Sequence, residues 1–217
     1  MSTPAPAGIT AKFAMIFCLL CLAVSIGVLI SARRVVSIDA GQKSPADIVL
    51  ANIAQRKSVR AFLPDKTIEE DTLITLAKAA MAAPTARDKR PWQIYAINDR
   101  AKLDALAEGL PNGKMIQNCS AVMVVCGDMN LALEGNGRDY WIQDCSAATE
   151  NLLLAAEALG LGAVWTGGYP AEDRVKAIQE KLALPETTIP LSLVVIGYPT
   201  GVEKPKDKWN PAQFHFN

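Results

Sequence analysis

The sequence predicts a mixed α/β domain with about four strands and five helices. Two observations lead to this class. Half of the 217 residues are apolar, which is enough to fill the core of one compact domain of ordinary size. Short valine-rich apolar runs alternate along the chain with longer segments that carry helical periodicity and helix-end signals. We therefore expect one sheet flanked by helices.

The helices are predicted from their ends. Ser44 followed by Pro45 indicates a helix start, with serine as N-cap and proline at the first helical position. Thr67 and Glu70 form the Thr-x-x-Glu pattern of a capping box, and the helix that they open should stop before Pro84. Further helices are predicted at 99–110, 139–160 and 171–184.

The strands are predicted from short runs that alternate or are uniformly apolar. They are "WQIYAI" (92–97), "AVMVVCGD" (121–128), "GAVWTG" (162–167) and "LSLVVIGYP" (191–199). The long helix at 139–160 is apolar on nearly every side, so we expect it at the centre of the domain or in a subunit interface. Trp141 near its start is interpreted as a core residue, and Cys145 as packing.

Charge and composition exclude several classes of function. Lys plus Arg equals Asp plus Glu at 22 each, so no global field draws the protein to nucleic acid, and no such partner is expected. The single histidine, His215, gives a zinc site or a Ser-His-Asp triad little to build on, and no metal is predicted. The five cysteines are interpreted as small apolar residues of a reducing compartment; they are Cys18, Cys21, Cys119, Cys126 and Cys145.

The N-terminal region predicts a membrane anchor. Residues 13–30, "FAMIFCLLCLAVSIGVLI", carry no charge, and their length just reaches the range of a helix that spans a bilayer. Arg33 and Arg34 oppose Lys12 and the terminal amine, and this small bias favours a cytoplasmic domain. The predicted organisation is a tail, an anchor, a linker and one folded domain, at 1–12, 13–30, 31–43 and 44–217.

Three loops concentrate charge, proline and glycine. They are "RKSVR" (56–60), "APTARDKRPW" (83–92) and "WTGGYP" (165–170). The first places three cations and a hydroxyl within five positions, which suits a local anion site but is also compatible with a solvated basic helix end. Paired glycines at the end of a strand let backbone N–H groups approach a flat ligand closely. Each loop alone is equally compatible with an ordinary turn.

Together and in this order, these loops resemble the nitroreductase family of flavin enzymes. The resemblance covers about residues 47–216 and rests on "RKSVRAF", "APTARDKRPW", "QDCSAATENLLLAAEALGLGAVWTG" and the closing "IGYP" with the "FHFN" tail. It implies an α/β (α+β) fold with a central mixed β-sheet flanked by helices. It also implies a homodimer, with the long helix at the dimer interface and FMN in a cleft between the two subunits.

The resemblance assigns the FMN phosphate to side chains at both ends of the chain. Arg56, with Lys206 or Lys208 from the tail, would hold the phosphate, since charge-assisted donors suit a dianion. Ser58 would add a hydroxyl near the phosphate and the ribityl chain. The full set of implied cofactor-binding residues is Arg56, Lys57, Ser58, Arg60, Pro84, Thr85, Asp88, Gly167, Gly168, Lys206 and Lys208.

The flavin ring is assigned to the same loops. Arg60 would lie against the pyrimidine edge near N1 and O2, where a fixed cation stabilises the charge that reduction places there. The backbone N–H of Gly167 would point at N5. Pro84, Thr85 and Asp88 would come from the other subunit and line the ring.

Two positions depart from the family's pattern, which usually has Asn in place of Asp88 and Gln in place of Arg90. An ionised Asp cannot donate a hydrogen bond to a ring oxygen, so its contact with the flavin is in question. The alternative is that Asp88 pairs with Arg87 or Arg90 at the surface.

The resemblance implies an NAD(P)H-dependent flavin oxidoreductase. Hydride would pass from NADH or NADPH through flavin N5 to a small-molecule acceptor such as a nitroaromatic or a quinone, with no catalytic side chain of the protein's own. Three alternatives remain: a reductive dehalogenase of the iodotyrosine deiodinase type, a non-catalytic membrane-tethered flavin-binding protein, and a protein with this fold but no cofactor.

Overall fold

The computed structural model describes residues 43–108, 110 and 113–216. The chain divides into two compact units, Met1–Val49 and Leu50–Asn217. The predicted tail, the anchor at 13–30 and nearly all of the linker lie outside the described residues and stay predictions. Within the described part, no helix is long and apolar enough to cross a membrane.

Helix α2 (Pro45–Gln55) begins where the sequence predicts. The hydroxyl of Ser44 accepts a hydrogen bond from the backbone N–H of Asp47 at 3.1 Å. The Asp47 carboxylate accepts in return from the backbone N–H of Ser44 at 3.2 Å and from its hydroxyl at 2.7 Å. This reciprocal pairing satisfies free N–H groups at the helix start and confirms the predicted N-cap.

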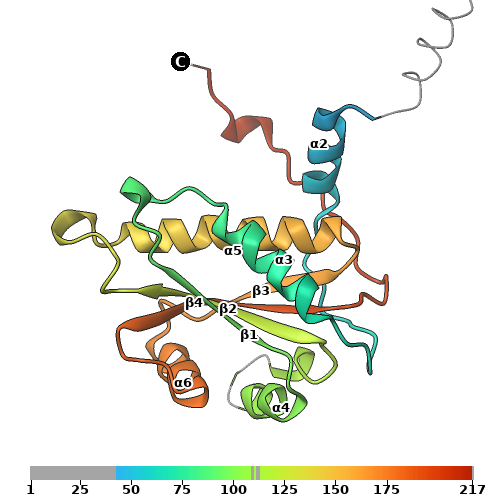
Figure 1. The fold of residues 1–217 in the computed structure, drawn as a ribbon. Helices are drawn as coiled ribbons and strands as arrows, with labels where there is room; N and C mark the ends of the chain where they lie inside the picture. Colours follow the sequence, from blue (N-terminus) through green and yellow to red (C-terminus); the bar gives the residue numbers. More distant parts are fainter. Residues whose placement is uncertain (1–42, 109, 111–112, 217) are drawn as a thin grey trace, which may run out of the picture. The chain divides into compact units, whose positions relative to one another are not determined.

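The sheet has four strands in the order β1-β2-β4-β3 (Figure 1). They are β1 (Trp92–Ile97), β2 (Ala121–Asp128), β3 (Gly162–Gly167) and β4 (Thr188–Gly197). All three ladders are antiparallel, so the expected mixed sheet is not found among these strands. The one parallel pairing in the described part of the chain is an isolated bridge between Ser58 and Ala163. The four predicted strands are confirmed, although β4 begins three residues earlier than expected.

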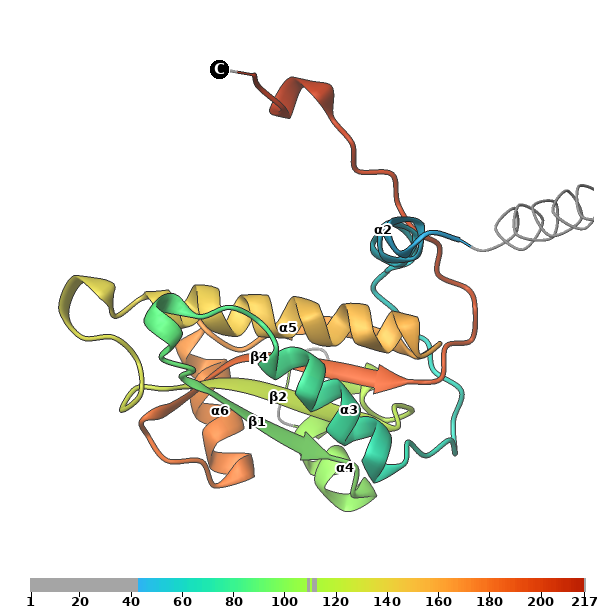
Figure 2. The same cartoon turned by 45° about the horizontal axis from the view of Figure 1, so that its top comes forward.

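Helices cover both faces of the sheet (Figures 1 and 2). On one face lie α3 (Glu70–Met81) and α5 (Tyr140–Ala158), and on the other lie α4 (Arg100–Glu108) and α6 (Glu172–Leu182). Successive residues of β2 point to opposite faces, so Met123 packs in the core under α5 and Val124 in the core under α4 and α6. Burial on both faces explains why β2 is uniformly apolar. In the described part of the chain there are also four short 3₁₀ turns, at Ala86–Asp88, Gly113–Met115, Gly135–Gly137 and Pro211–Gln213.

One prediction about a helix is wrong in detail, and one is left open. Helix α3 begins at Glu70 rather than near Thr67, and its N-cap, Glu69, makes no side-chain capping bond. A capping-box pattern marks a helix start only if the chain turns at that residue, and here the chain stays irregular for three more positions. Helix α5 is buried on one side in the protomer and half-buried on the other, which includes Ile142 and Leu154, so the predicted place of this helix in a subunit interface stays a prediction.

The predicted core residues of α5 are confirmed. Trp141 is 3% exposed and its ring packs edge-on against that of Tyr169, with centroids 5.0 Å apart. Cys145 is fully buried, and burial raises its pKa to about 12. Cys119 and Cys126 are buried as well, and none of these three forms a disulfide. The described cysteines are therefore inert packing residues.

Candidate flavin site at the outer edge of β3

The basic segment "RKSVRAF" lies across the ends of β3 and β4, where the two strands carry glycines. Gly162 and Gly197 are cross-strand partners. A Cβ at Gly162 would lie 2.6 Å from Cγ1 of Val59, and a Cβ at Gly197 would lie 2.8 Å from Cδ1 of Phe62. Val59 and Phe62 are buried at 1% and 4% exposure. The paired glycines thus let these two apolar side chains settle on the sheet, which fixes the segment between them.

Backbone hydrogen bonds hold the same segment at both ends. The N–H of Val59 donates to the carbonyl of Ala163 at 2.9 Å, and the N–H of Leu63 donates to the carbonyl of Tyr198 at 2.8 Å. The carbonyl of Ala61 accepts from Thr200 N at 3.1 Å. Arg60 lies between these fixed points, and its exposed guanidinium makes only a long contact of 3.4 Å to the Ser58 carbonyl. Its backbone is therefore anchored while its charge faces outward.

Two of the predicted cations are paired with carboxylates of α5. Arg56 Nε lies 3.0 Å from Oε1 of Glu150. The ammonium of Lys57 contacts both carboxylate oxygens of Glu157, at 3.1 and 3.2 Å. Arg56 is held through one edge of its guanidinium, which leaves other N–H groups of the fork for an anion. Lys57 is committed to Glu157, so its role in this structure is to attach the segment to α5.

The two glycines at the end of β3 differ in their surroundings. The N–H of Gly168 donates to the carbonyl of Leu191 at 2.9 Å. Because N–H groups alternate between the two sides of a strand, the N–H of Gly167 points away from β4, toward the outer edge of β3. A Cβ at Gly167 would meet nothing within 4 Å, whereas a Cβ at Gly168 would lie 2.5 Å from the carbonyl oxygen of Pro190. Gly167 faces open space, and Gly168 is required by packing.

The outer edge of β3 therefore carries two features of a binding surface, the anchored basic segment and an outward backbone N–H. Val59 pairs with Ala163 on this edge, and the N–H of Gly167 points from the same edge four residues further on. At the rise of an extended strand this separation is about 13 Å. The anchored basic segment and the outward N–H of Gly167 thus lie on the same edge of the sheet, where a ligand with an anionic end and a planar end could contact both.

The loop between α3 and β1 is held by a buried carboxylate. Oδ1 of Asp144, a residue of α5 that is 6% exposed, accepts from the backbone N–H of Ala86 at 2.8 Å. Burial raises the pKa of Asp144, and the bond from Ala86 only partly opposes it. Arg87, Asp88 and Arg90 all have positive φ, at 52°, 54° and 49°. Such conformations are costly for residues with a side chain, and they gather where function or packing enforces them.

The two departures from the family's pattern face each other across this loop. The guanidinium of Arg90 donates to both carboxylate oxygens of Asp88, at 2.7 and 2.6 Å. The hydrogen bond from Arg90 holds the pKa of Asp88 below its usual value. Both side chains are exposed. In the protomer Asp88 is therefore a paired surface carboxylate, as the alternative interpretation expected, and its contact with a flavin stays a prediction.

A single protomer does not bring all the predicted residues together. Arg56 is attached to α5 at Glu150 and Lys57 at Glu157. The loop of Pro84, Thr85 and Asp88 is attached to α5 at Asp144. At 1.5 Å per residue, the two cation contacts lie about 9 and 20 Å along the helix from that point. Lys206 and Lys208 are exposed in a tail whose described hydrogen bonds beyond Glu203 are all local.

Four acidic residues of this site have no place in the sequence-based prediction: Asp144, Glu150, Glu157 and Glu203. Glu150 and Glu157 are seven residues apart, two helical turns, so they share one face of the predicted long helix. That spacing was a usable signal for a pair of cation partners. Glu203 lies in "EKPKDK", which is indistinguishable from a solvated tail, and nothing in the sequence singles it out.

Comparison with known proteins identifies the family in which this arrangement occurs. The profile of the nitroreductase family matches residues 53–114 and 108–198. A protein of Archaeoglobus fulgidus, provisionally named NADH dehydrogenase/NAD(P)H nitroreductase, is 41% identical over 169 residues, which cover 76% of this chain and 95% of that protein. The FMN reductase (NADPH) of Bacillus subtilis is 26% identical over 184 residues, which cover 77% of this chain and 73% of the relative.

Solved structures agree. A crystal structure of an NADH dehydrogenase/NAD(P)H nitroreductase, also provisionally named, from Bacteroides thetaiotaomicron superposes with a TM-score of 0.73 at 42% identity, covering 81% of this chain and 99% of that one. An FMN-dependent nitroreductase from Clostridium difficile gives a TM-score of 0.70 at 26% identity, covering 77% and 98%. The expected nitroreductase-like fold is confirmed, and the chain belongs to the nitroreductase family.

Proposed function

We propose that this protein is an FMN-dependent oxidoreductase that takes hydride from NADH or NADPH and reduces a small oxidised acceptor, such as a nitroaromatic or a quinone. The observation that carries the proposal is the outer edge of β3, where the basic segment is anchored at Ala163 and the N–H of Gly167 points outward four residues further on. Relatives named as an NAD(P)H nitroreductase and an FMN reductase support the same chemistry.

The residues present fit the cofactor. Arg56 keeps guanidinium N–H groups for a phosphate, since Glu150 contacts its Nε. Arg60 has an anchored backbone and an exposed charge that can lie at the pyrimidine edge of a flavin ring. A methyl group at Gly167 would occupy space on the face of the sheet that is open in the protomer, and glycine keeps that space free for a planar ligand beside its N–H. FMN, when bound, supplies the hydride chemistry at N5.

The chain's own contribution is binding and electrostatics. The cation of Arg60 stabilises negative charge on a reduced ring, and the N–H of Gly167 offers a hydrogen bond to the reacting edge. Neither group has to reorganise during the reaction, because Val59 and Phe62 fix the first segment and the β3–β4 ladder fixes the second.

A homodimer completes this site in the proposal. The loop of Pro84, Thr85 and Asp88 is attached about 9 Å along α5 from the contact of Arg56 and about 20 Å from that of Lys57. In the proposed dimer this loop would line the flavin of the second copy, as the family resemblance implies. The tail exposes large aromatic side chains, including Trp209 at 68% and Phe216 at 91%. Exposed aromatic side chains in a tail indicate an interaction surface.

The membrane anchor at 13–30 and a cytoplasmic location of the folded domain are also part of the proposal. They rest on the uncharged length of that segment and on the flanking basic residues. Attachment to a membrane would hold the site close to lipid-soluble acceptors, among which quinones are the natural class.

The deciding experiment is spectroscopic. The full-length protein, purified in detergent, is expected to be yellow, to release FMN on denaturation, and to bleach under anaerobic conditions with NADH or NADPH. Reoxidation by a quinone or a nitroaromatic then gives the acceptor class. A protein that binds FMN but is bleached by neither nicotinamide would be a flavin-binding protein rather than a reductase, and a colourless protein that takes up no FMN would refute the proposal.

A further inference from the structure

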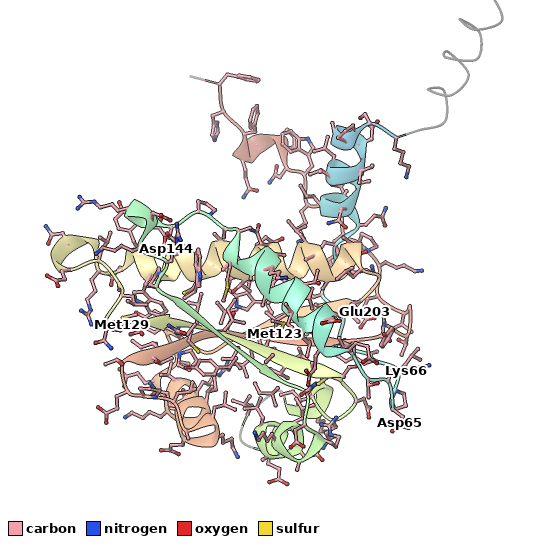
Figure 3. All side chains as sticks on the ribbon, viewed as in Figure 1. Asp65, Lys66, Met123, Met129, Asp144 and Glu203 are labelled. Atoms are coloured by element: carbon pink, nitrogen blue, oxygen red, sulfur yellow. The ribbon has the colours of Figure 1, made fainter. Side chains whose placement is uncertain are left out.

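A carboxylate that follows β4 binds the backbone of the basic segment. Oε1 of Glu203 accepts from the backbone N–H of Arg60 at 2.7 Å and from that of Ala61 at 2.9 Å. The two partners lie 143 and 142 residues earlier in the chain. Figure 3 labels Glu203 and Asp144, which lie toward opposite ends of the molecule in that view.

The contact uses a known anion-binding arrangement. Two successive backbone N–H groups that converge on one point form a concave donor site for an anion. Here the chain's own carboxylate fills it. Burial works to raise the pKa of Glu203, but the N–H groups of Arg60 and Ala61 and the charge of Arg60 outweigh burial and hold the pKa below its usual value. The carboxylate is thus bound as an anion.

Glu203 is also the point where the tail leaves the protomer. It is half-buried, its Oε2 is buried, and every described residue from Lys204 to Phe216 is exposed. Among the described residues, the hydrogen bonds of the tail beyond this point are all within the tail. One side chain therefore ties the backbone of Arg60 to the start of the segment that carries Lys206 and Lys208.

We propose that Glu203 is a positioning residue of the flavin site. Its carboxylate fixes the backbone of Arg60 and the start of the C-terminal tail, so that the cations of both segments can contact FMN at the same time. This inference rests on the proposed function. It also requires that the phosphate is held by side chains and not by the N–H groups of Arg60 and Ala61, because Glu203 occupies those donors.

The test compares three variants of the full-length protein. Glu203→Ala removes the acceptor, and Glu203→Gln keeps an oxygen of the same shape for both N–H groups. The matched control is Asp99→Ala, which removes the carboxylate that accepts from Lys102 N at 3.0 Å at the start of α4, where it makes no hydrogen bond to the basic segment. Each variant is measured for thermal stability, for the Kd of FMN and riboflavin, and for amide hydrogen exchange at Arg60 and Ala61.

Glu203→Ala is expected to weaken FMN about tenfold or more, as the loss of one or two hydrogen bonds would. Riboflavin, which lacks the phosphate, should lose less. Exchange at Arg60 and Ala61 should accelerate in the same variant. Glu203→Gln should restore FMN binding and exchange to near the wild type. Asp99→Ala should lose stability and keep the wild-type Kd.

Three outcomes would overturn the inference. An unchanged FMN Kd in Glu203→Ala would make the residue merely structural. Tighter FMN binding would show that Glu203 competes with the phosphate for the N–H groups. Unchanged amide hydrogen exchange at Arg60 and Ala61 in Glu203→Ala would show that the carboxylate does not hold these two N–H groups. If the wild type binds no FMN, the proposed function and the positioning role fall together, and the exchange data still decide whether Glu203 holds the segment.

Discussion

Gly167 and Gly168 are adjacent, yet the structure predicts opposite consequences for the same substitution. A Cβ at Gly167 would meet no heavy atom within 4 Å, and Gly167 does not have a positive φ. Alanine is therefore compatible with the fold there, and such a change stabilises a protein by about 0.4–1 kcal/mol through the unfolded state. A Cβ at Gly168 would lie 2.5 Å from the carbonyl oxygen of Pro190, which is backbone and cannot move away cheaply.

The magnitudes follow from these contacts. Overpacking at Gly168 should cost about 1–3 kcal/mol, which for a domain of this size lowers the Tm by about 2–12 °C. In Gly167→Ala the methyl group would instead occupy open space beside the outward N–H and would crowd a flavin ring bound there. A cost of about 1–3 kcal/mol there raises the Kd of FMN about 5- to 150-fold.

The assay separates folding from binding. Thermal unfolding is measured on flavin-free protein, because bound FMN would itself raise the Tm. The Kd is measured by titration of the same samples with FMN. Gly167→Ala should keep or slightly raise the Tm and lose flavin, and Gly168→Ala should lower the Tm. If Gly167→Ala binds FMN like the wild type, the outer edge of β3 does not face the flavin and the site has been placed wrongly.

Three further predictions concern charged residues. Arg56→Ala should weaken FMN by about 1.5–3 kcal/mol, or about 10- to 150-fold in Kd, and leave riboflavin nearly unchanged in the same titration; an equal loss for both ligands would place Arg56 away from the phosphate. As the pH rises from about 4, the Tm of the wild type should fall relative to that of Asp144→Asn, because a carboxyl whose pKa is raised by folding stabilises the protein only at low pH. A difference in Tm between the two proteins that stays constant with pH would contradict this. Asp88→Asn should raise the midpoint potential of bound FMN, Arg90→Gln should lower it, and the double variant should return toward the wild type. The potentials are measured by dye-equilibrated reduction. No shift in any variant would show that Asp88 and Arg90 pair at the surface, away from the flavin.

How much the sequence could predict depends on how far apart the interacting residues are. The strands and the start of α2 were predicted from signals within a few residues, and Ser44 with Asp47 shows why: both partners of the cap lie in one turn. The start of α3 was predicted wrongly because Thr67 and Glu70 have the spacing of a capping box, but the chain becomes helical only at Glu70. Clasps such as that of Glu203 join residues more than 140 positions apart, and a single sequence carries no record of that contact.

Helix α5 does more than fill the core. Its apolar composition predicted burial alone, yet three of its carboxylates each hold one segment of the candidate site. Asp144 holds the loop at Ala86, while Glu150 and Glu157 hold Arg56 and Lys57. A helix has a fixed rise per residue, so α5 places the contacts of Arg56 and Lys57 about 9 and 20 Å from the contact of the loop. One helix thus spaces the two segments that, in the proposed dimer, would contact the flavins of different protomers.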